Sequence, residues 1–489
     1  MRRGLPVLES AAVARKSAPA VSVGIISLGC AKNLVDAEVM LGHLAEGGAR
    51  ITADLDEAEV IVVNTCGFIA DAKRESIQTI LEVAARKGDG TLKRLVVAGC
   101  MAQRYAAELE AEIPEIDAVI GLDELQRAPE AVLGAIGRDH VPDQRGALAL
   151  YDHASPRLLA TGGVFAYLKV AEGCDNPCAF CHIPRMRGAF RSRTVESLVA
   201  EARRLEELGV RELILVAQDT TRYGEDLGLG TTGLRRLLEA LLAGTSLPWL
   251  RFLYAYPATL DERIFALMRA EPRLLPYLDI PLQHASRKVL KLMKRGGDAR
   301  SYRSLIARAR AAVPSLAVRT TFIVGFPGEG EEEFAELQRF VAEVGFDHVG
   351  VFAYSWQPEN PGAELGDPVP HRTKERRRRA IMRQQETISR ARHRALKGTR
   401  VTALVEGASQ ESELLLQGRL PQQAPEVDGR VVFADGTARA GDLVTAVIRK
   451  TYAFDLVAEI EGVVRPAAAR RSLVLPTLPA VPVGVPAGR

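Results

Sequence analysis

The sequence predicts an α/β protein with three successive domains: an N-terminal parallel-sheet α/β domain, a central partial barrel of six βα units, and a small C-terminal OB-like β-barrel. Three observations support this order. Residues 21–112 repeat a buried strand followed by a helix three times, and residues 165–352 contain six further strands with helices between them. Residues 400–460 instead hold short strands separated by Gly, Asp and Pro turns. Strands that alternate with helices indicate parallel sheets, whereas short strands alone indicate a barrel or sandwich.

Length and composition fit this division. The chain has 489 residues, which corresponds to about three domains, and its 47% hydrophobic and 26% charged residues are typical of a soluble globular protein. The net charge of +3 argues neither for nor against a nucleic-acid partner. No apolar run reaches about eighteen residues, so we expect no transmembrane helix. The charged start Met1–Pro6 lacks the apolar segment of a signal peptide, which predicts a cytoplasmic protein with reduced thiols.

The first domain is predicted over residues 21–145, after a leader at 1–20 whose Ala, Arg, Ser and Pro content indicates disorder. Each of its three strand segments contains a cysteine at its end, and each is followed by a helical segment. The strand segments are Val21–Cys30, Val60–Gly67 and Leu95–Cys100, and the helical segments are Leu34–Leu44, Ala70–Lys87 and Gln103–Glu112.

These cysteines form the first trio: Cys30, Cys66 and Cys100. In open α/β sheets, ligand sites form beyond the carboxyl ends of the strands, so the three thiols should converge. Cysteine is also a common buried residue, but its repeated placement at one point of the strand–helix unit argues against chance. Iron–sulfur cubes are held by cysteine thiolates, and no fourth ligand is evident. The first trio therefore predicts a four-iron cluster with one open iron.

Residues from about 122 to 160 are polar and irregular, and we expect them to lead into a second domain over 160–397. This domain has helical stretches such as Val195–Leu208 and Gly233–Leu242 between its strands. The six candidate strands are Phe165–Val170, Glu212–Ala217, Leu250–Tyr254, Tyr277–Ile280, Val318–Val324 and His348–Phe352. Six βα units form an incomplete version of the eight-fold barrel, in which catalytic residues come from the carboxyl ends of the strands.

The second trio of cysteines follows the first of these strands with the spacing C-x3-C-x2-C: Cys174, Cys178 and Cys181. The turn at Asp175–Pro177 allows three sulfurs to point at one cluster, and three thiolates on a four-iron cube again leave one iron open. A zinc site and unrelated thiols are the alternatives. Zinc usually takes four protein ligands, and His182 is poorly placed to be the fourth because it adjoins Cys181.

Polar, glycine and proline residues follow the later strands of this domain. The segments are Gln218–Gly224, Tyr256–Pro257, Pro281–Ser286 and Gly325–Glu329. Each segment alone is typical of an ordinary turn. Because all four are expected at one rim of the barrel, together they predict a cofactor and substrate pocket.

A basic helix is predicted at His371–Lys397, where eleven Lys and Arg residues accompany two Glu residues. Such a run is suited to a phosphate backbone, although a solvated linker helix fits the composition equally well.

The third domain is predicted over 398–465, before a flexible tail at 466–489. Its five strand segments are Arg400–Glu406, Leu414–Arg419, Gly429–Phe433, Leu443–Ile448 and Leu456–Ile460. Small barrels that bind nucleic acid carry a positive groove and stacking aromatic residues. This domain has seven basic against ten acidic residues and few aromatic ones, so a basic protein is the better expectation as a partner.

The motif of the second trio resembles the signature of the radical S-adenosylmethionine (SAM) superfamily, and the third domain resembles a TRAM domain. Together with the three-cysteine domain in front, the chain resembles the methylthiotransferase family over about residues 21–465. Within that family it is similar to the branch that modifies an aspartate of the S-twelve protein of the small ribosomal subunit. The motifs that carry this resemblance are Ser27–Asp36, Ala217–Thr221, Leu278–Ala285 and Ala424–Gly429. Ala31 stands where many relatives have proline, but it is not a ligand.

The resemblance implies two 4Fe–4S clusters and SAM as cofactors. The second trio would hold the cluster that cleaves SAM reductively, and the resulting 5′-deoxyadenosyl radical would abstract hydrogen from the β-carbon of the aspartate. The first trio would hold an auxiliary cluster that carries the sulfur to be inserted. Gln218, Asp219 and Gly325 are expected to contact SAM, and no general acid or base can be named.

The partners implied are the S-twelve protein and an electron donor such as flavodoxin or ferredoxin, with no membrane and a monomeric enzyme. Two other interpretations remain open. The same chemistry on adenosine in transfer RNA, the activity of a sister branch, is favoured by the basic helix. A nucleic-acid or ribosome-binding protein with purely structural clusters is the second.

Overall fold

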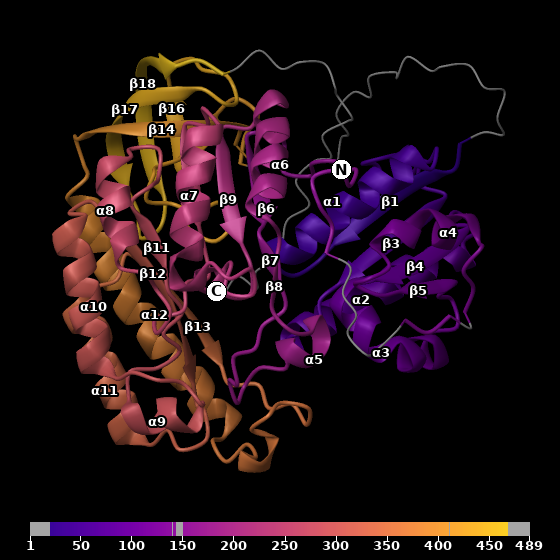
Figure 1. The fold of residues 1–489 in the computed structure, drawn as a ribbon, viewed down its shortest axis with the longest axis horizontal. Coiled ribbons are helices and arrows are strands. Elements are labelled where there is room, and N and C mark those ends of the chain that lie inside the picture. Colours follow the sequence, from indigo (N-terminus) through magenta and orange to yellow (C-terminus); the bar gives the residue numbers. More distant parts are fainter. Residues whose placement is uncertain (1–19, 139, 143–149, 410, 468–489) are drawn as a thin grey trace. The chain divides into compact units, whose positions relative to one another are not determined.

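The computed structural model describes residues 20–138, 140–142, 150–409 and 411–467, and these fall into two compact units (Figure 1). Unit 1 contains the described residues up to Asp175 together with His182–Arg193. Unit 2 contains Asn176–Cys181 and the described residues from Thr194 onward. The predicted leader and tail lie almost wholly outside the described residues. Within the described part of the chain, no helix is long and apolar enough to cross a membrane.

Unit 1 is built on a five-stranded parallel sheet with the order β2-β1-β3-β4-β5. Its strands are β1 (Ser22–Ser27), β2 (Arg50–Ile51), β3 (Val60–Thr65), β4 (Arg94–Ala98) and β5 (Ala118–Ile120). The strands are in register at their starts, with Val23 beside Val60 and Val60 beside Arg94. The predicted N-terminal parallel-sheet α/β domain is thus confirmed.

Two hydrophobic layers cover the two faces of this sheet, because alternate strand residues point to opposite sides. Val60, Val62 and Val96 pack under α1 (Ala31–Glu46) and α4 (Ala128–Leu133). The alternate residues Ile61, Val63 and Val97 pack under α2 (Ala70–Gly88) and α3 (Gly99–Glu112). Such continuous apolar strands are what the sequence pattern predicted for a sheet buried on both faces.

Helix α4 corrects the expectation that residues 122–160 are irregular. A short 3-10 helix at Leu125–Arg127 leads into α4, where Pro129 occupies the first turn and Gly134 ends the helix with φ +86°. Proline is favoured in a first helical turn, and glycine is favoured at a left-handed helix end. Buried Ala128, Ala131 and Val132 fix this short helix against the sheet.

The rest of unit 1 comes from the segments on either side of the second trio. They comprise β6 (Phe165–Lys169), β7 (Ala171–Glu172), α5 (Ile183–Arg187) and β8 (Arg191–Ser192). Strands β7 and β8 pair in antiparallel fashion, with Glu172 beside Arg191.

Unit 2 contains the remaining five strands predicted for the barrel. Strands β9 (Glu212–Val216) and β10 (Trp249–Phe252) pair in parallel, as do β11 (Tyr277–Asp279), β12 (Ala317–Val324) and β13 (His348–Ala353). The helices are α6 (Val195–Glu207), α7 (Gly233–Gly244), α8 (Arg263–Ala270), α9 (Arg287–Leu292), α10 (Ala299–Ala312) and α11 (Glu331–Val344). Short 3-10 helices lie at Thr220–Arg222, Gly230–Thr232 and Ala363–Leu365. All six predicted strands are present within two residues of their expected ends.

The C-terminal part of unit 2 is a closed five-stranded barrel with the order β14-β15-β16-β18-β17, as predicted. Its strands are β14 (Arg400–Ala408), β15 (Leu416–Arg419), β16 (Val431–Asp435), β17 (Leu443–Thr451) and β18 (Leu456–Arg465). Val405, Phe433 and Ile448 are among its core residues. This barrel, yellow in Figure 1, contacts β9 through the buried Arg419, which pairs with Glu212 at 2.5 Å.

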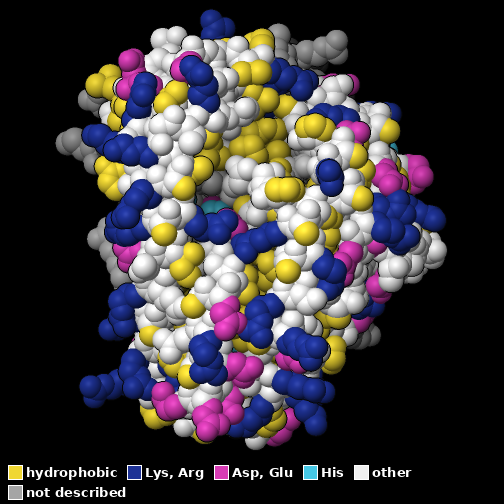
Figure 2. Space-filling model, turned by 90° about the vertical axis from the view of Figure 1, so that its left-hand side faces the viewer, with side chains coloured by type: hydrophobic (Ala, Val, Ile, Leu, Met, Phe, Trp, Pro, Cys, Tyr) yellow, Lys and Arg dark blue, Asp and Glu magenta, His cyan; other side chains and the backbone are white. Residues whose placement is uncertain are grey.

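Helix α12 (His371–Arg394) is the predicted basic helix. Two of its cations are buried: Arg377 pairs with Glu329 at 2.8 Å, and Lys374 pairs with Asp367. Arg372, Arg379 and Arg383 are exposed and line a shallow groove. On the face of the molecule in Figure 2, Lys and Arg side chains are spread widely among acidic ones. The basic composition of α12 is therefore partly structural.

Candidate iron–sulfur sites

The first trio lies at the strand ends predicted for it. Cys30 directly precedes α1, Cys66 directly follows β3, and Cys100 is the second residue of α3. Gly29 has φ +92°, and a Cβ atom there would lie 3.0 Å from the Sγ of Cys66. The chain before Cys30 therefore passes directly against Cys66, and only glycine fits at this position.

Two asparagines tie these strand ends together. The Nδ2 of Asn33 donates to the carbonyl of Leu28 at 2.6 Å and to that of Thr65 at 3.2 Å. Asn64 donates in return to the carbonyl of Asn33 at 2.7 Å. The Thr65 hydroxyl donates to the carbonyl of Ala98 at 2.6 Å, which links β3 to β4. These buried hydrogen bonds fix the backbone on which all three cysteines stand.

The thiols of the first trio influence one another electrostatically. Burial, together with the neighbouring Cys100 and Cys30, raises the pKa of Cys66 to about 12. Burial likewise raises the pKa of Cys100 to about 11, although Arg187 opposes that shift. Burial acts to raise the pKa of Cys30 as well, but Lys32 and Arg187 outweigh it and lower the value.

The chemistry of this donor set fits an iron–sulfur cluster. All six cysteines are free. Thiols with a raised pKa, such as Cys66 and Cys100, become thiolates when a metal binds, because metal ligation requires the deprotonated form. Among the described residues, no three His, Cys, Asp or Glu side chains form a site for a single metal ion. A four-iron cube places each thiolate on a different iron, so it does not require such a site.

A buried charge cluster adjoins the first trio. Arg187 is 2% exposed, and its Nη2 lies 3.1 Å from the Sγ of Cys100 and 3.0 Å from Asp36. Its Nη1 lies 3.0 Å from both carboxylate oxygens of Glu172. Lys169 pairs with Asp36 and, at 2.7 Å, with Glu172. Two cations thus balance two anions beside Cys100.

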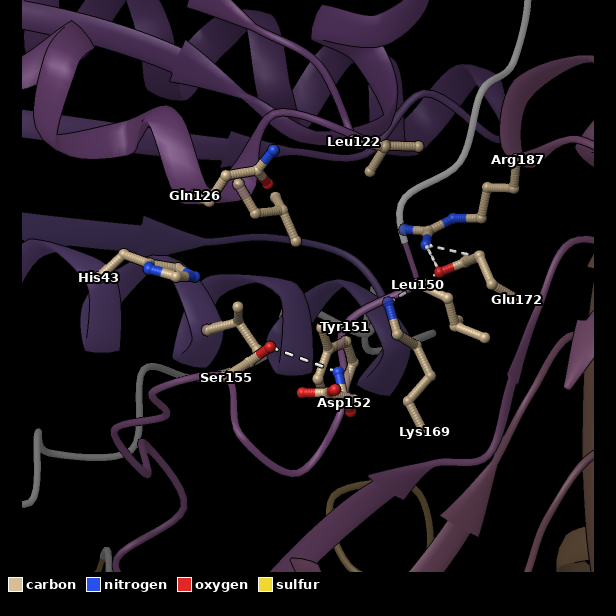
Figure 3. A pocket seen from close by; sticks show the side chains of 12 residues that line it. His43, Leu122, Gln126, Leu150, Tyr151, Asp152, Ser155, Lys169, Glu172 and Arg187 are labelled. Carbon is tan, nitrogen blue, oxygen red and sulfur yellow. Dashed lines mark hydrogen bonds and ion pairs between the residues drawn. The ribbon is translucent and has the colours of Figure 1, made fainter. Parts of the chain in front are cut away.

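A cavity of about 300 Å³ lies next to this charge cluster (Figure 3). Lys169, Glu172 and Arg187 line one part of it, and Figure 3 shows His43 on the opposite side. Arg187 therefore both contacts Cys100 and lines the cavity.

The second trio is held by backbone contacts that each unit provides separately. In unit 1, the N–H of Cys174 donates to the carbonyl of Gly188 at 3.1 Å. In unit 2, the N–H of Ala179 donates to the carbonyl of Met293 at 3.0 Å, and its carbonyl accepts from Gly362 at 2.9 Å. The Nη1 of Arg295 lies 3.6 Å from the Sγ of Cys178.

Two of the three residues predicted to contact SAM, Asp219 and Gly325, have hydrogen-bond partners within unit 2. Asp219 is buried and accepts from Asn176 at 2.8 Å and from the Thr221 hydroxyl at 2.6 Å. Burial raises the pKa of its carboxyl group. Gly325 has φ +76° and donates its N–H to Glu329 at 2.7 Å. Gln218 is half-buried at the end of β9.

Two residues at the barrel rim have a positive φ angle, a backbone conformation that residues other than glycine rarely adopt. Tyr254 has φ +62° after β10, and Gln283 has φ +71° after β11. The N–H of Tyr254 donates to Asp279 at 2.9 Å, and its carbonyl accepts from Thr220 at 3.1 Å. Strained backbone of this kind is typical of functional sites. No local sequence pattern indicates the backbone conformation of Tyr254, because its φ depends on these tertiary contacts.

Comparison with known proteins agrees with this division of the chain. Residues 22–121 match the uncharacterized protein family UPF0004, residues 168–341 match the radical SAM superfamily, and residues 398–460 match the TRAM domain. The structure of the radical SAM methyltransferase TsrM from Kitasatospora setae is similar, with a TM-score of 0.50 at 15% identity over 71% of this chain and 77% of that chain. This likeness concerns the fold alone.

Curated relatives are far more similar in sequence. Proteins from Trichlorobacter lovleyi and from Anaeromyxobacter sp. (strain K), both named ribosomal protein uS12 methylthiotransferase RimO, are 48% and 47% identical to this chain. The matches cover 90% and 96% of this chain, and 98% of each relative.

The fold, the second trio and the three matched regions define a radical SAM enzyme with a TRAM domain, a class that uses SAM and a 4Fe–4S cluster. Relatives at this level of identity and coverage narrow the class to one family. The chain belongs to the RimO family of ribosomal protein uS12 methylthiotransferases.

Proposed function

We propose that this protein attaches a methylthio group to the β-carbon of an aspartate in ribosomal protein uS12. The observation that supports this most directly is the first trio in unit 1, a second set of free cysteines besides the radical SAM motif. One cysteine trio accounts for opening a C–H bond, whereas forming a C–S bond also needs a bound source of sulfur. The names of the relatives identify uS12 as the substrate of that family.

Two 4Fe–4S clusters would occupy the two trios, with Cys174, Cys178 and Cys181 holding the cluster common to radical SAM enzymes. Cys30, Cys66 and Cys100 would hold the auxiliary cluster. When bound, the two clusters and SAM supply the radical, the sulfur and the methyl group. The chain itself positions these groups. Asn33 and Asn64 hold the first trio, while the bond from Asn176 to Asp219 anchors the loop that leads to Cys178.

Gln218, Asp219 and Gly325 remain our candidates for contacts to SAM at the rim of the barrel. Asp219 already accepts from Asn176 and Thr221, so we propose that it orders the loop before Cys178 as well as the cofactor. Gly325 provides a surface without a side chain; a Cβ there would lie 2.3 Å from Lys374.

The remaining partners follow from the chemistry. Reductive cleavage of SAM requires a one-electron donor, and we propose a flavodoxin or ferredoxin. We propose a monomeric enzyme in the cytoplasm, a compartment that free thiols and a ribosomal substrate favour. Transfer RNA is the less favoured substrate, because the curated relatives at 44–48% identity are named for uS12.

Anaerobic reconstitution with iron and sulfide tests this function. The enzyme is incubated with SAM, dithionite and either a uS12 peptide that contains the target aspartate or unmodified transfer RNA, and the products are examined by mass spectrometry. We expect the peptide to gain one methylthio group on the aspartate. A Cys66→Ser variant should cleave SAM without this product. Methylthiolation of transfer RNA with an unmodified peptide would contradict the proposal.

A further inference from the structure

We propose that Arg187 and Arg295 are paired positioning residues, each of which sets the reduction potential of a different cluster through a hydrogen bond to one cysteine sulfur. This inference rests on the proposed assignment of the two clusters. It assigns separate roles to two arginines that lie outside both cysteine motifs.

Arg187 is fixed against the first trio by buried contacts on both ends of its guanidinium group. Nη2 lies 3.1 Å from the Sγ of Cys100, while Nη1 donates to both carboxylate oxygens of Glu172 at 3.0 Å. The guanidinium group is planar and permanently charged, so these contacts hold its orientation. A hydrogen bond to sulfur is therefore built into the fold.

The charges around Arg187 balance its own charge and so stabilise it in the protein interior. Arg187 and Lys169 oppose Asp36 and Glu172, and all four side chains are at most 10% exposed. Unpaired buried charges cost several kcal/mol each, which a balanced network avoids. Lys169, Asp36 and Glu172 thus hold Arg187 in place, and only Arg187 among them donates to a cysteine sulfur.

Arg295 occupies the matching place beside the second trio. Its Nη1 lies 3.6 Å from the Sγ of Cys178, and its Nη2 donates to the carbonyl of Pro281 at 2.9 Å. The guanidinium carbon lies 4.2 Å from the centre of the Tyr256 ring, a cation–π contact that steadies the group. Arg295 belongs to unit 2 and Arg187 to unit 1, so the two arginines are held by separate parts of the fold.

Hydrogen bonds to the sulfurs and nearby positive charge are known determinants of the potential of an iron–sulfur cluster. Both stabilise the reduced form, which carries one more negative charge, and so raise the potential. The shorter contact of Arg187 predicts the larger effect. Each arginine should affect its own cluster only.

Redox titration of the reconstituted full-length enzyme, followed by electron paramagnetic resonance, tests this inference. Triple cysteine-to-alanine variants of each trio assign the two signals. Arg187→Met should lower the midpoint potential of the auxiliary cluster alone, and Arg295→Met that of the radical SAM cluster alone. Arg187→Lys and Arg295→Lys keep the positive charge. Each should therefore have a midpoint potential between those of the matching Met variant and the wild type.

Three outcomes would overturn the inference or its premise. Unchanged potentials with full iron content would show that the arginines are structural only, even if the denaturation midpoint falls. Equal shifts of both clusters in either variant would exclude separate roles. If Arg187→Met loses iron, the midpoint potentials of Arg187→Lys and Arg295→Met test the inference instead. A wild-type iron content of about four per chain, not about eight, would instead contradict the proposed second cluster.

Discussion

At the scale of single residues, the first trio depends on small neighbours as much as on its cysteines. Gly29 combines a positive φ with direct contact to Cys66, and Gly99, also at φ +92°, leaves no room for a Cβ beside Asn64. These glycines let three strand ends meet closely enough for the thiols to interact. Their side-chain-free backbone is therefore part of the proposed cluster site.

Gly29→Ala should prevent binding of the proposed auxiliary cluster. The new Cβ would lie 2.8 Å from the Cβ of Cys66, which must then move. Gly48→Ala is the matched control, because Gly48 has φ +86° and open space around it. Both variants should lose about 1 kcal/mol of unfolding free energy from backbone strain, but only Gly29→Ala should lose iron, from about eight to about four per chain. Equal iron contents would contradict the role given to Gly29.

The cysteines of the candidate site could be predicted from the sequence, whereas their surroundings could not. Spacing and strand position are local patterns, and they identified all six thiols. Arg187 contacts Cys100 only because α5 packs in the same unit as α3, and no local pattern reports that. Asp36 stood at the end of a recognised motif, but its pairing with Lys169 across 133 residues is a property of the folded chain.

At the scale of elements, the strands and the long helices were predictable, whereas the short helix α4 was not. Helix α12 spans 24 residues and β12 spans eight, and both were expected. Helix α4 has six residues among polar neighbours, too few to show a helical period. Its stability comes from tertiary packing against the sheet. Pro129 followed by Gly134 was the one local signal for it.

Strand β15 should fix the C-terminal barrel to β9 through Arg419. This side chain is 3% exposed and pairs with Glu212 at 2.5 Å and Glu406 at 2.6 Å. Arg419→Met would leave buried carboxylates short of a partner, so we expect a loss of about 3 kcal/mol in unfolding free energy. Arg449→Met, which removes an exposed pair with Glu459, should cost less than about 1 kcal/mol. Urea denaturation measures both, and similar losses would contradict this role.

At the scale of the whole molecule, unit 2 joins two folds through buried polar contacts. Asp428 of the C-terminal barrel accepts from the Tyr277 hydroxyl at 2.6 Å and lies 3.4 Å from Arg319 and 3.3 Å from His348. These partners come from β11, β12 and β13. The C-terminal barrel is therefore attached to three neighbouring strands of the central domain by one carboxylate.

This attachment should weaken in acid. Burial acts to raise the pKa of Asp428, but His348, Arg319 and the Tyr277 hydroxyl outweigh it and hold the pKa below its usual value. A carboxyl group whose pKa is lowered by folding stabilises the protein at pH values above its pKa in the unfolded chain, which is about 4. This stability is lost as the pH falls from there through the pKa of the folded state. Asp428→Asn should unfold more easily at pH 7 and lose less stability in acid. Asp435→Asn, at an exposed position, should match the wild type in its unfolding free energy at pH 7 and in the stability that it loses in acid.

Each trio should bind its cluster without the other, but methylthiolation should require both. Each set of cysteines is anchored mainly by its own contacts, so removing one set should leave the other cluster in place. Replacing Cys30, Cys66 and Cys100 by alanine should leave about four irons per chain and intact SAM cleavage, but no methylthiolated peptide. Replacing Cys174, Cys178 and Cys181 should also leave about four irons, but without SAM cleavage. Iron and sulfide assays, 5′-deoxyadenosine release and peptide mass spectrometry measure the three properties.

Methylthiolation by the variant that lacks Cys30, Cys66 and Cys100 would contradict the need for an auxiliary cluster, because the sulfur would then come from elsewhere.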